Sequence, residues 1–118
     1  MRKLVAVFAS LVFVLGLSAC SASADPVEVG PDTVVIDVRT AAEYDAGHLE
    51  GATLLDLNSG EFQAELPSLD PAGEYIVYCR SGNRSGQATK MMEDAGFENV
   101  TDLGSMENAS EATGLAIE

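Results

Sequence analysis

Positive charge is scarce in this sequence and unevenly placed. Six Lys and Arg residues stand against 19 Asp and Glu residues, so the formal net charge is −13. Two of the basic residues occupy positions 2 and 3, and the rest of the chain holds four: Arg39, Arg80, Arg84 and Lys90. Residues 20–118 therefore carry a formal charge of −15. Such a chain has no basic patch that could neutralise phosphates, so nucleic-acid binding is disfavoured and we expect no nucleic-acid partner.

Cysteine and histidine are scarce too, and tryptophan is absent. The chain has two Cys, one His and no Trp, and no metal-ligand spacing occurs in it. A zinc site around one histidine and one free cysteine would need several carboxylates, so we predict no bound metal. The 99 residues that follow position 19 suffice for one domain with one hydrophobic core.

The N-terminus has the pattern of a secretion signal. Arg2 and Lys3 precede an almost continuous apolar run at 4–17, which is too short to span a bilayer comfortably. The run ends in Leu17-Ser18-Ala19-Cys20, which is similar to the processing box of bacterial lipoproteins. In that box cleavage falls before the cysteine, whose sulfur then receives lipid. An ordinary cleavable signal with a chance cysteine is the alternative.

We therefore expect a signal peptide at 1–19 and a tether at 20–27 that starts from lipidated Cys20. The protein would then be exported and held in the bacterial cell envelope by a lipid anchor in the membrane. With Cys20 modified, Cys79 has no partner for an intramolecular disulfide. A single free thiol in an exported protein suggests reactivity or pairing with a partner.

A strand, a cysteine, a polar loop and a helix follow one another in residues 74–96. Tyr75 to Tyr78 are β-branched or aromatic, and Cys79 comes directly after them. A loop with two glycines then leads into an apolar stripe at helical spacing, formed by Ala88, Met91, Met92 and Ala95. The pattern places Cys79 at the carboxyl end of a strand and close to a helix N-terminus.

That placement favours a reactive thiol at Cys79. Ligands of open α/β sheets bind at the carboxyl ends of the strands. Unpaired N–H groups and the positive end of a helix dipole stabilise an anion there, and Arg80 and Arg84 add positive charge. We expect the pKa of Cys79 to be lowered and the residue to act as a nucleophile. A buried, inert cysteine is the alternative.

Strands alternate with helices in the rest of the chain. Thr40 and Glu43 form a capping box, so a helix should begin at Thr40 and end at Gly47. A second helix is expected at 61–66 before Pro67, and the tail after Gly104 should be short helix or coil. Strands are expected at 27–29, 33–38, 52–55, 74–78 and 100–103. Alternation of this kind predicts an α/β fold, a mainly parallel sheet of about five strands with helices on both faces.

Three segments resemble the single-domain rhodanese-like, or thiosulfate sulfurtransferase, family. They are Asp37-Val38-Arg39 followed by Glu43-Tyr44, then Gly47-His48-Leu49-Glu50-Gly51-Ala52, then Cys79-Arg80-Ser81-Gly82-Asn83-Arg84-Ser85. They occur in the family's order and spacing. The resemblance covers about residues 28–104 and implies a small rhodanese-like domain at 28–118.

The resemblance implies sulfurtransferase chemistry. Cys79 would take a sulfane sulfur from a small anionic donor such as thiosulfate, hold it as a persulfide, and pass it to cyanide or an acceptor thiol. No cofactor is needed beyond this covalent intermediate. The anion-binding loop would be Arg80, Ser81, Gly82, Asn83, Arg84 and Ser85, with backbone N–H groups stabilising the thiolate and Arg80 and Arg84 holding the donor oxygens.

The resemblance implies structural support from Asp37, Arg39 and Glu43, with Arg39 and Glu43 forming an ion pair beside the loop. It also implies that His48 is a turn residue rather than a general base. The sequence departs from the family after the last predicted strand. Many members have two glycines and an aromatic residue there, whereas this chain has Gly104-Ser105-Met106-Glu107-Asn108.

The same residues bear on three other functions. Tyrosine-phosphatase-like enzymes place Arg six positions after the cysteine, where this chain has Ser85, so that class is disfavoured. A redox role through mixed disulfides lacks a second nearby cysteine. The alternative that stays open is a sulfur-relay or binding module without turnover, which would act on a protein partner.

Overall fold

A computed structural model describes residues 25–118, which include the whole predicted domain. The predicted signal peptide and Cys20, the predicted lipidation site, lie outside the described residues. Within residues 25–118 no helix combines the length and the apolar character that crossing a membrane requires.

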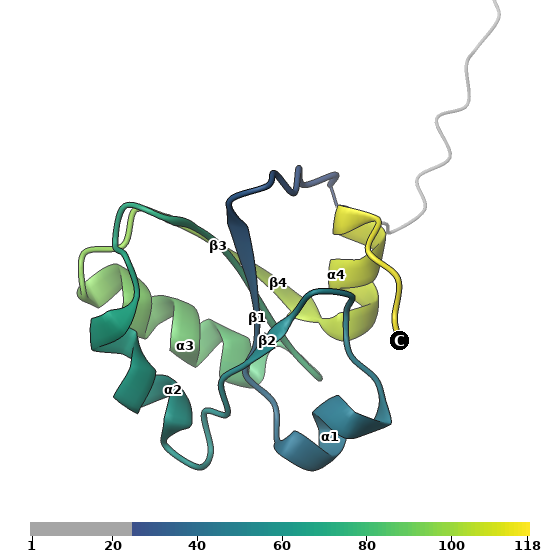
Figure 1. Ribbon diagram of the computed structural model, residues 1–118, viewed down its shortest axis with the longest axis horizontal. Coiled ribbons are helices and arrows are strands. Elements are labelled where there is room, and N and C mark those ends of the chain that lie inside the picture. The colour runs from purple at the N-terminus through teal and green to yellow at the C-terminus, as the bar shows by residue number, and fades with distance from the viewer. Residues whose placement is uncertain (1–24) are drawn as a thin grey trace, which may run out of the picture.

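The described chain folds into a four-stranded sheet flanked by helices (Figure 1). The sheet order is β2-β1-β3-β4, and all three neighbouring pairs are parallel. The elements in chain order are β1 (Thr33–Asp37), α1 (Ala41–Ala46), β2 (Thr53–Leu54), α2 (Glu61–Glu65), the 3-10 helix η1 (Leu66–Ser68), β3 (Glu74–Cys79), α3 (Asn83–Asp94), β4 (Asn99–Ser105) and α4 (Met106–Thr113).

Helices cover both faces of the sheet, as the sequence predicted (Figure 1). Side chains of a strand alternate between the two faces, so each strand contributes to two apolar clusters. On one face Val77 packs with Phe62 of α2 and Met92 of α3. On the other face Ile76 packs with Ala109 of α4, and Tyr44 of α1 packs against the same cluster.

The prediction of about five strands was wrong, because the segment at 27–29 does not join the sheet. The N–H of Val27 donates to the carbonyl oxygen of Ala112 at 2.8 Å. Val27 and Val29 also pack against the apolar cluster on the α4 side. The β-branched composition of the segment therefore reflects packing against a helix rather than pairing with a strand.

The boundaries of the remaining elements follow local signals. Thr40 Oγ1 accepts from the N–H of Glu43 and Glu43 Oε1 accepts from the N–H of Thr40, both at 3.3 Å, which confirms the capping box. The tail that was predicted as short helix or coil forms α4, and Ser105 caps its N-terminus. Beyond α4, Ile117 pairs with Leu49 in an antiparallel bridge.

Candidate active site

Cys79 is the last residue of β3 and lies at the carboxyl edge of the sheet, where its sequence position placed it. The parallel register sets Asp37 of β1 beside Tyr78 and Ser105 of β4 beside Cys79. Only three residues, 80–82, separate β3 from the first turn of α3. The geometry therefore brings the thiol of a central strand directly to a helix N-terminus.

The sulfur of Cys79 is held by groups of the same loop and helix. The N–H of Gly82 donates to Sγ at 2.9 Å, and the thiol donates to Ser85 Oγ at 3.4 Å. Gly82 has a φ of 99°, in the left-handed region that favours glycine. This turn directs the N–H toward the sulfur. Ser85 is fully buried, and its hydroxyl also donates to the carbonyl oxygen of Gly82 at 3.2 Å.

This cradle lowers the pKa of the Cys79 thiol. Burial alone raises the pKa, because it disfavours the charged thiolate. Hydrogen bonds from the Ser85 side chain and from the backbone of Ser85, Gly82 and Ser81 act in the opposite direction and together outweigh burial. The result is a thiol that ionises more readily than a free cysteine, as a nucleophile requires.

The structure corrects the predicted length of the active-site loop. Asn83, Arg84 and Ser85 already belong to α3, so they stand on the first helical turn. The Asn83 side chain accepts from Gln87 Nε2 at 2.7 Å and is exposed. The stripe of apolar residues starts only at Ala88, because the first turn faces the site and carries polar residues. Because this first turn is polar, the apolar pattern in the sequence did not indicate where α3 begins.

The predicted ion pair between Arg39 and Glu43 was wrong. Arg39 is buried and pairs with Asp37, with 2.7 Å between Nη2 and Oδ2. Glu43 binds Arg84 through two hydrogen bonds of 2.7 and 3.0 Å. Two separate ion pairs therefore replace the single one, because Asp37 is two residues from Arg39 and already occupies its guanidinium group.

These pairs also change the view of Arg84, which was predicted to bind an anion together with Arg80. Both terminal nitrogens of Arg84 are taken up by the Glu43 carboxylate. Arg84 lowers the pKa of Glu43 to about 2 through that hydrogen bond, against the effect of burial. Arg80 is exposed and forms no ion pair or side-chain hydrogen bond with any other residue in 25–118. It is the better candidate for binding an anion.

Asp37 and Arg39, both predicted as structural support, belong to a buried polar network, in which sequence reasoning missed Tyr78. The hydroxyl of Tyr78 donates to Asp37 Oδ2 at 2.7 Å and accepts from the N–H of Leu49 at 3.0 Å. Arg39 Nη2 donates to the carbonyl oxygen of Gly47 at 2.6 Å. Burial raises the pKa of Tyr78, so the hydroxyl stays protonated as a donor. A tyrosine in a strand buried on both faces needs such a partner, which was the available signal.

His48 has contacts that suit the structural role expected for it. Its ring stacks on Tyr44 with 3.8 Å between centroids, and Nδ1 lies 2.9 Å from the carbonyl oxygen of Tyr44. Its backbone pairs with Glu118 in both directions at 2.8 and 2.9 Å. These contacts fix the turn after α1.

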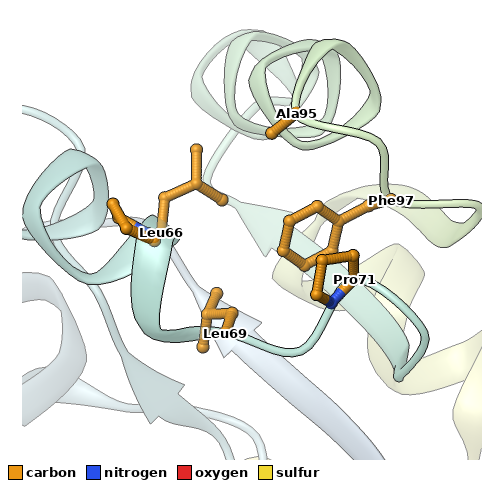
Figure 2. A pocket seen from close by; sticks show the side chains of 6 residues that line it. Leu66, Leu69, Pro71, Ala95 and Phe97 are labelled. Atoms are coloured by element: carbon orange, nitrogen blue, oxygen red, sulfur yellow. The ribbon is translucent and has the colours of Figure 1, made fainter.

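An apolar pocket of about 360 Å³ lies away from this site. Figure 2 shows side chains of η1 and of the segment after α3 converging on it. Its lining is Leu66, Pro67, Leu69, Pro71, Ala95 and Phe97. Cys79 is near the N-terminus of α3, whereas the pocket is at the C-terminus of that helix, so the pocket takes no part in the chemistry of the thiol.

Comparison with known proteins agrees with this geometry. The sequence model of the Rhodanese-like domain family matches residues 24–112. The chain belongs to the rhodanese-like family.

Its rhodanese-like relatives include proteins named for sulfur transfer. A probable adenylyltransferase/sulfurtransferase of Mycobacterium tuberculosis is 37% identical over 82 residues, covering 67% of this chain and 20% of that protein. The thiosulfate:glutathione sulfurtransferase of Saccharomyces cerevisiae is 34% identical over 82 residues, covering 60% of this chain and 59% of that protein. The chain thus spans about a fifth of the first relative and under two thirds of the second.

Solved rhodanese structures share the fold. A rhodanese from E. coli, solved with anions, has a TM-score of 0.62 and 25% identity, and the match covers 73% of this chain and 96% of that one. The rhodanese-like domain of an Anabaena protein has a TM-score of 0.62 and 28% identity, with 73% and 98% coverage. The match spans nearly the full length of both structures.

Proposed function

We propose that this protein is a sulfurtransferase that carries sulfane sulfur as a persulfide on Cys79, from a donor such as thiosulfate to a thiophilic acceptor. The observation that carries the proposal is the environment of the sulfur. Sγ of Cys79 accepts the N–H of Gly82 at 2.9 Å and lies 3.4 Å from Ser85 Oγ, at the N-terminus of α3. Family membership and sulfurtransferase relatives support the same role.

In the first half-reaction the thiolate of Cys79 attacks the outer sulfur of thiosulfate. A bond forms between Sγ and that sulfur, and the bond to the sulfonate sulfur breaks. Its electron pair leaves with sulfite, so a persulfide anion replaces the thiolate on the protein. The N–H groups that lower the pKa of the thiol would also stabilise the negative charge of the transferred sulfur.

In the second half-reaction the acceptor attacks the outer sulfur of the persulfide. With cyanide, a carbon–sulfur bond forms, thiocyanate leaves, and the electron pair of the broken S–S bond returns to Sγ. The thiolate is then restored. A covalent intermediate between two displacements predicts ping-pong kinetics. No external cofactor takes part in either step.

Arg80 is the residue that we assign to the sulfonate oxygens of the donor. Residues 25–118 hold four basic side chains, and three of these are in ion pairs. Arg80 follows Cys79 directly, is exposed, and has no such partner in the described chain. It can therefore meet an anion without first breaking an ion pair.

The proposal includes export and a lipid anchor. Both rest on the N-terminal sequence, in which a basic start, an apolar run at 4–17 and Leu17-Ser18-Ala19-Cys20 occur in order. With a formal charge of −15 over residues 20–118, electrostatic attraction to an anionic membrane is unfavourable. A lipid on Cys20 would supply the attachment.

One experiment tests the catalytic proposal. Thiosulfate:cyanide sulfurtransferase activity is measured for the chain and for Cys79→Ala, and intact mass is recorded after thiosulfate treatment. Turnover together with a gain of one sulfur atom, both absent from Cys79→Ala, is the expected result. If neither signal is seen in the unchanged chain, the proposed chemistry is wrong.

A sulfur relay to a protein partner is the second candidate. The observation that favours it is the size of the relatives, since the match covers about a fifth of the tuberculosis protein and of several tRNA uridine(34) hydroxylases. In such proteins the matched segment is a small part of a much longer chain. A gain of one sulfur atom on Cys79 with negligible turnover on cyanide would favour the relay.

A further inference from the structure

The bond between Glu43 and Arg84 joins two elements across the active site. Glu43 is in the first turn of α1, where its carboxylate also accepts from the N–H and the hydroxyl of Thr40. Arg84 is in the first turn of α3, five residues after Cys79. Their side chains are 25% and 18% exposed, so the pair is partly shielded from solvent.

We propose that Glu43 is a positioning residue that holds Arg84 beside Cys79 and cancels its charge, which leaves Arg80 as the uncompensated cation for an anionic sulfur donor. The part that concerns the donor rests on the proposed function. The part that concerns the thiol does not, because it follows from the charges around Cys79.

Arg84 is near enough to the thiol for the two groups to influence each other. The negative charge of Cys79 contributes to the raised pKa of Arg84, after the larger effects of the Glu43 hydrogen bond and burial. A guanidinium group in the first turn of α3 favours the thiolate, although the hydrogen bonds of the cradle have the larger effect on the pKa of Cys79. The carboxylate of Glu43, bound to the same guanidinium, offsets that stabilisation.

The offset has a chemical reason. A thiolate with a strongly lowered pKa is abundant but weak as a nucleophile. Its persulfide also gives up sulfur faster than that of a more basic thiol, because a thiol of lower pKa is the better leaving group. With Arg80 uncompensated and Arg84 paired, the thiolate of Cys79 stays a good nucleophile, and one cation is available to bind an anion. Two uncompensated arginines would bind a dianionic donor and the sulfite product more tightly.

Other charged or titratable groups lie on the elements around Cys79, and they are the same in every variant compared below. They are Asp37 at the end of β1, Arg39 two residues after it, Tyr78 of β3, Arg80 of the loop, and Asp102 of β4, whose carboxylate lies near Gly86. Asp37 and Arg39 form their own buried pair, so they add little net charge.

The test measures the rate at which a neutral alkylating agent, iodoacetamide, modifies Cys79 as a function of pH. The full chain is used, in a neutral detergent, with Cys20→Ser so that Cys79 is the one thiol. Glu43→Gln, Arg84→Gln and the double variant are compared with this parent. Glu50→Gln is the matched control, since Glu50 is exposed and its side chain forms no ion pair within residues 25–118. Circular dichroism confirms that each variant is folded.

A charge effect and a structural effect predict opposite shifts of the alkylation midpoint in Glu43→Gln. If Glu43 offsets Arg84, Glu43→Gln moves the alkylation midpoint to lower pH, Arg84→Gln moves it to higher pH, and the double variant returns close to the parent. A role limited to bracing the loop would loosen the cradle in both single variants and raise the midpoint in both. That outcome, or no shift in Glu43→Gln, would overturn the inference.

Thiosulfate kinetics test the donor part separately. In Glu43→Gln we expect KM for thiosulfate to fall about two- to tenfold, the range for one added charge at this screening. An unchanged or higher KM would contradict the donor part. If the parent has no turnover but the alkylation midpoints move as expected, the proposed function fails while the charge offset stands.

Discussion

Arg80 is the residue on which recognition of an anionic donor depends most directly. We expect Arg80→Gln to raise KM for thiosulfate about ten- to hundredfold with little change in kcat, because a charge-assisted contact contributes roughly 1.5–3 kcal/mol and is made on binding. Steady-state kinetics at fixed ionic strength measure this. Lys90→Gln is the control, since Lys90 is exposed and pairs with Asp94 on the far turns of α3. A loss confined to kcat would instead assign Arg80 to the transition state.

Ser85 is the residue of the cradle whose side chain forms a hydrogen bond with the thiol of Cys79. Its hydroxyl can turn from the carbonyl oxygen of Gly82 and donate to a thiolate, a bond that Ser85→Ala removes. A hydrogen bond worth about 0.5–1.5 kcal/mol gives a two- to tenfold loss of thiolate below the pKa. We therefore expect the pH–rate profile of Cys79 alkylation to move to higher pH.

Ser81→Ala is the matched control for that change. Ser81 acts on the thiol through its backbone, and its side chain is exposed. Its alkylation profile should coincide with that of the unchanged protein. If Ser85→Ala leaves the profile in place, the backbone N–H groups alone stabilise the thiolate.

For single residues, the sequence identified the reacting thiol of Cys79 and most residues around it, but not which of them form ion pairs. Cys79, Gly82 and Ser85 meet because they lie within one short segment. The partner of Glu43 depends on where α1 and α3 approach each other, which local spacing does not contain. Asp37 and Tyr78 come together only when β1 and β3 pair in register.

The helix α3 with its preceding turn is the element that makes the site. Gly82 has a φ of 99°, and an alanine there would adopt a left-handed conformation that costs about 1–2 kcal/mol. We expect Gly82→Ala to lower the free energy of unfolding by about that amount and to slow Cys79 alkylation at pH 7. Urea unfolding and alkylation rates measure the two effects.

Gly86 supplies the opposite case within the same helix. It has no positive φ, and an added Cβ would lie 3.7 Å from Asp102 Oδ2, an ordinary contact. Gly86→Ala should therefore raise the free energy of unfolding by about 0.5–1 kcal/mol. Equal effects of the two substitutions would mean that the left-handed turn at Gly82 is not required.

The sequence predicted the elements where local chemistry decides them. The capping box fixed the start of α1, and the β-branched runs fixed β1 and β3. It failed where tertiary contact decides, as for the segment at 27–29, which binds the end of α4. It also failed at the start of α3, where residues that serve the site replace the apolar pattern of a helix.

The whole molecule is dominated by negative charge. Residues 25–118 contain four basic and all 19 acidic side chains, and at neutral pH these charges repel one another in the compact state. Sodium chloride screens the repulsion, with a Debye length of about 10 Å at 0.1 M and about 3 Å at 1 M. We expect Tm at pH 7 to rise by about 4–8 °C between these concentrations, if screening contributes about 1 kcal/mol.

The choice of salt and a charge variant distinguish screening of charge repulsion from other effects of salt on Tm. Chloride is used because sulfate stabilises proteins by exclusion from their surface, whatever their charge. Glu111→Lys on the exposed side of α4 reduces the net negative charge by two, so it should raise Tm at 0.1 M and reduce the further gain at 1 M. Salt also weakens the ion pair of Glu43 and Arg84. The rate of Cys79 alkylation should therefore depend on sodium chloride concentration in a different way from Tm. A Tm that falls with salt would show that attractive pairs, rather than overall repulsion, control the stability of this acidic domain.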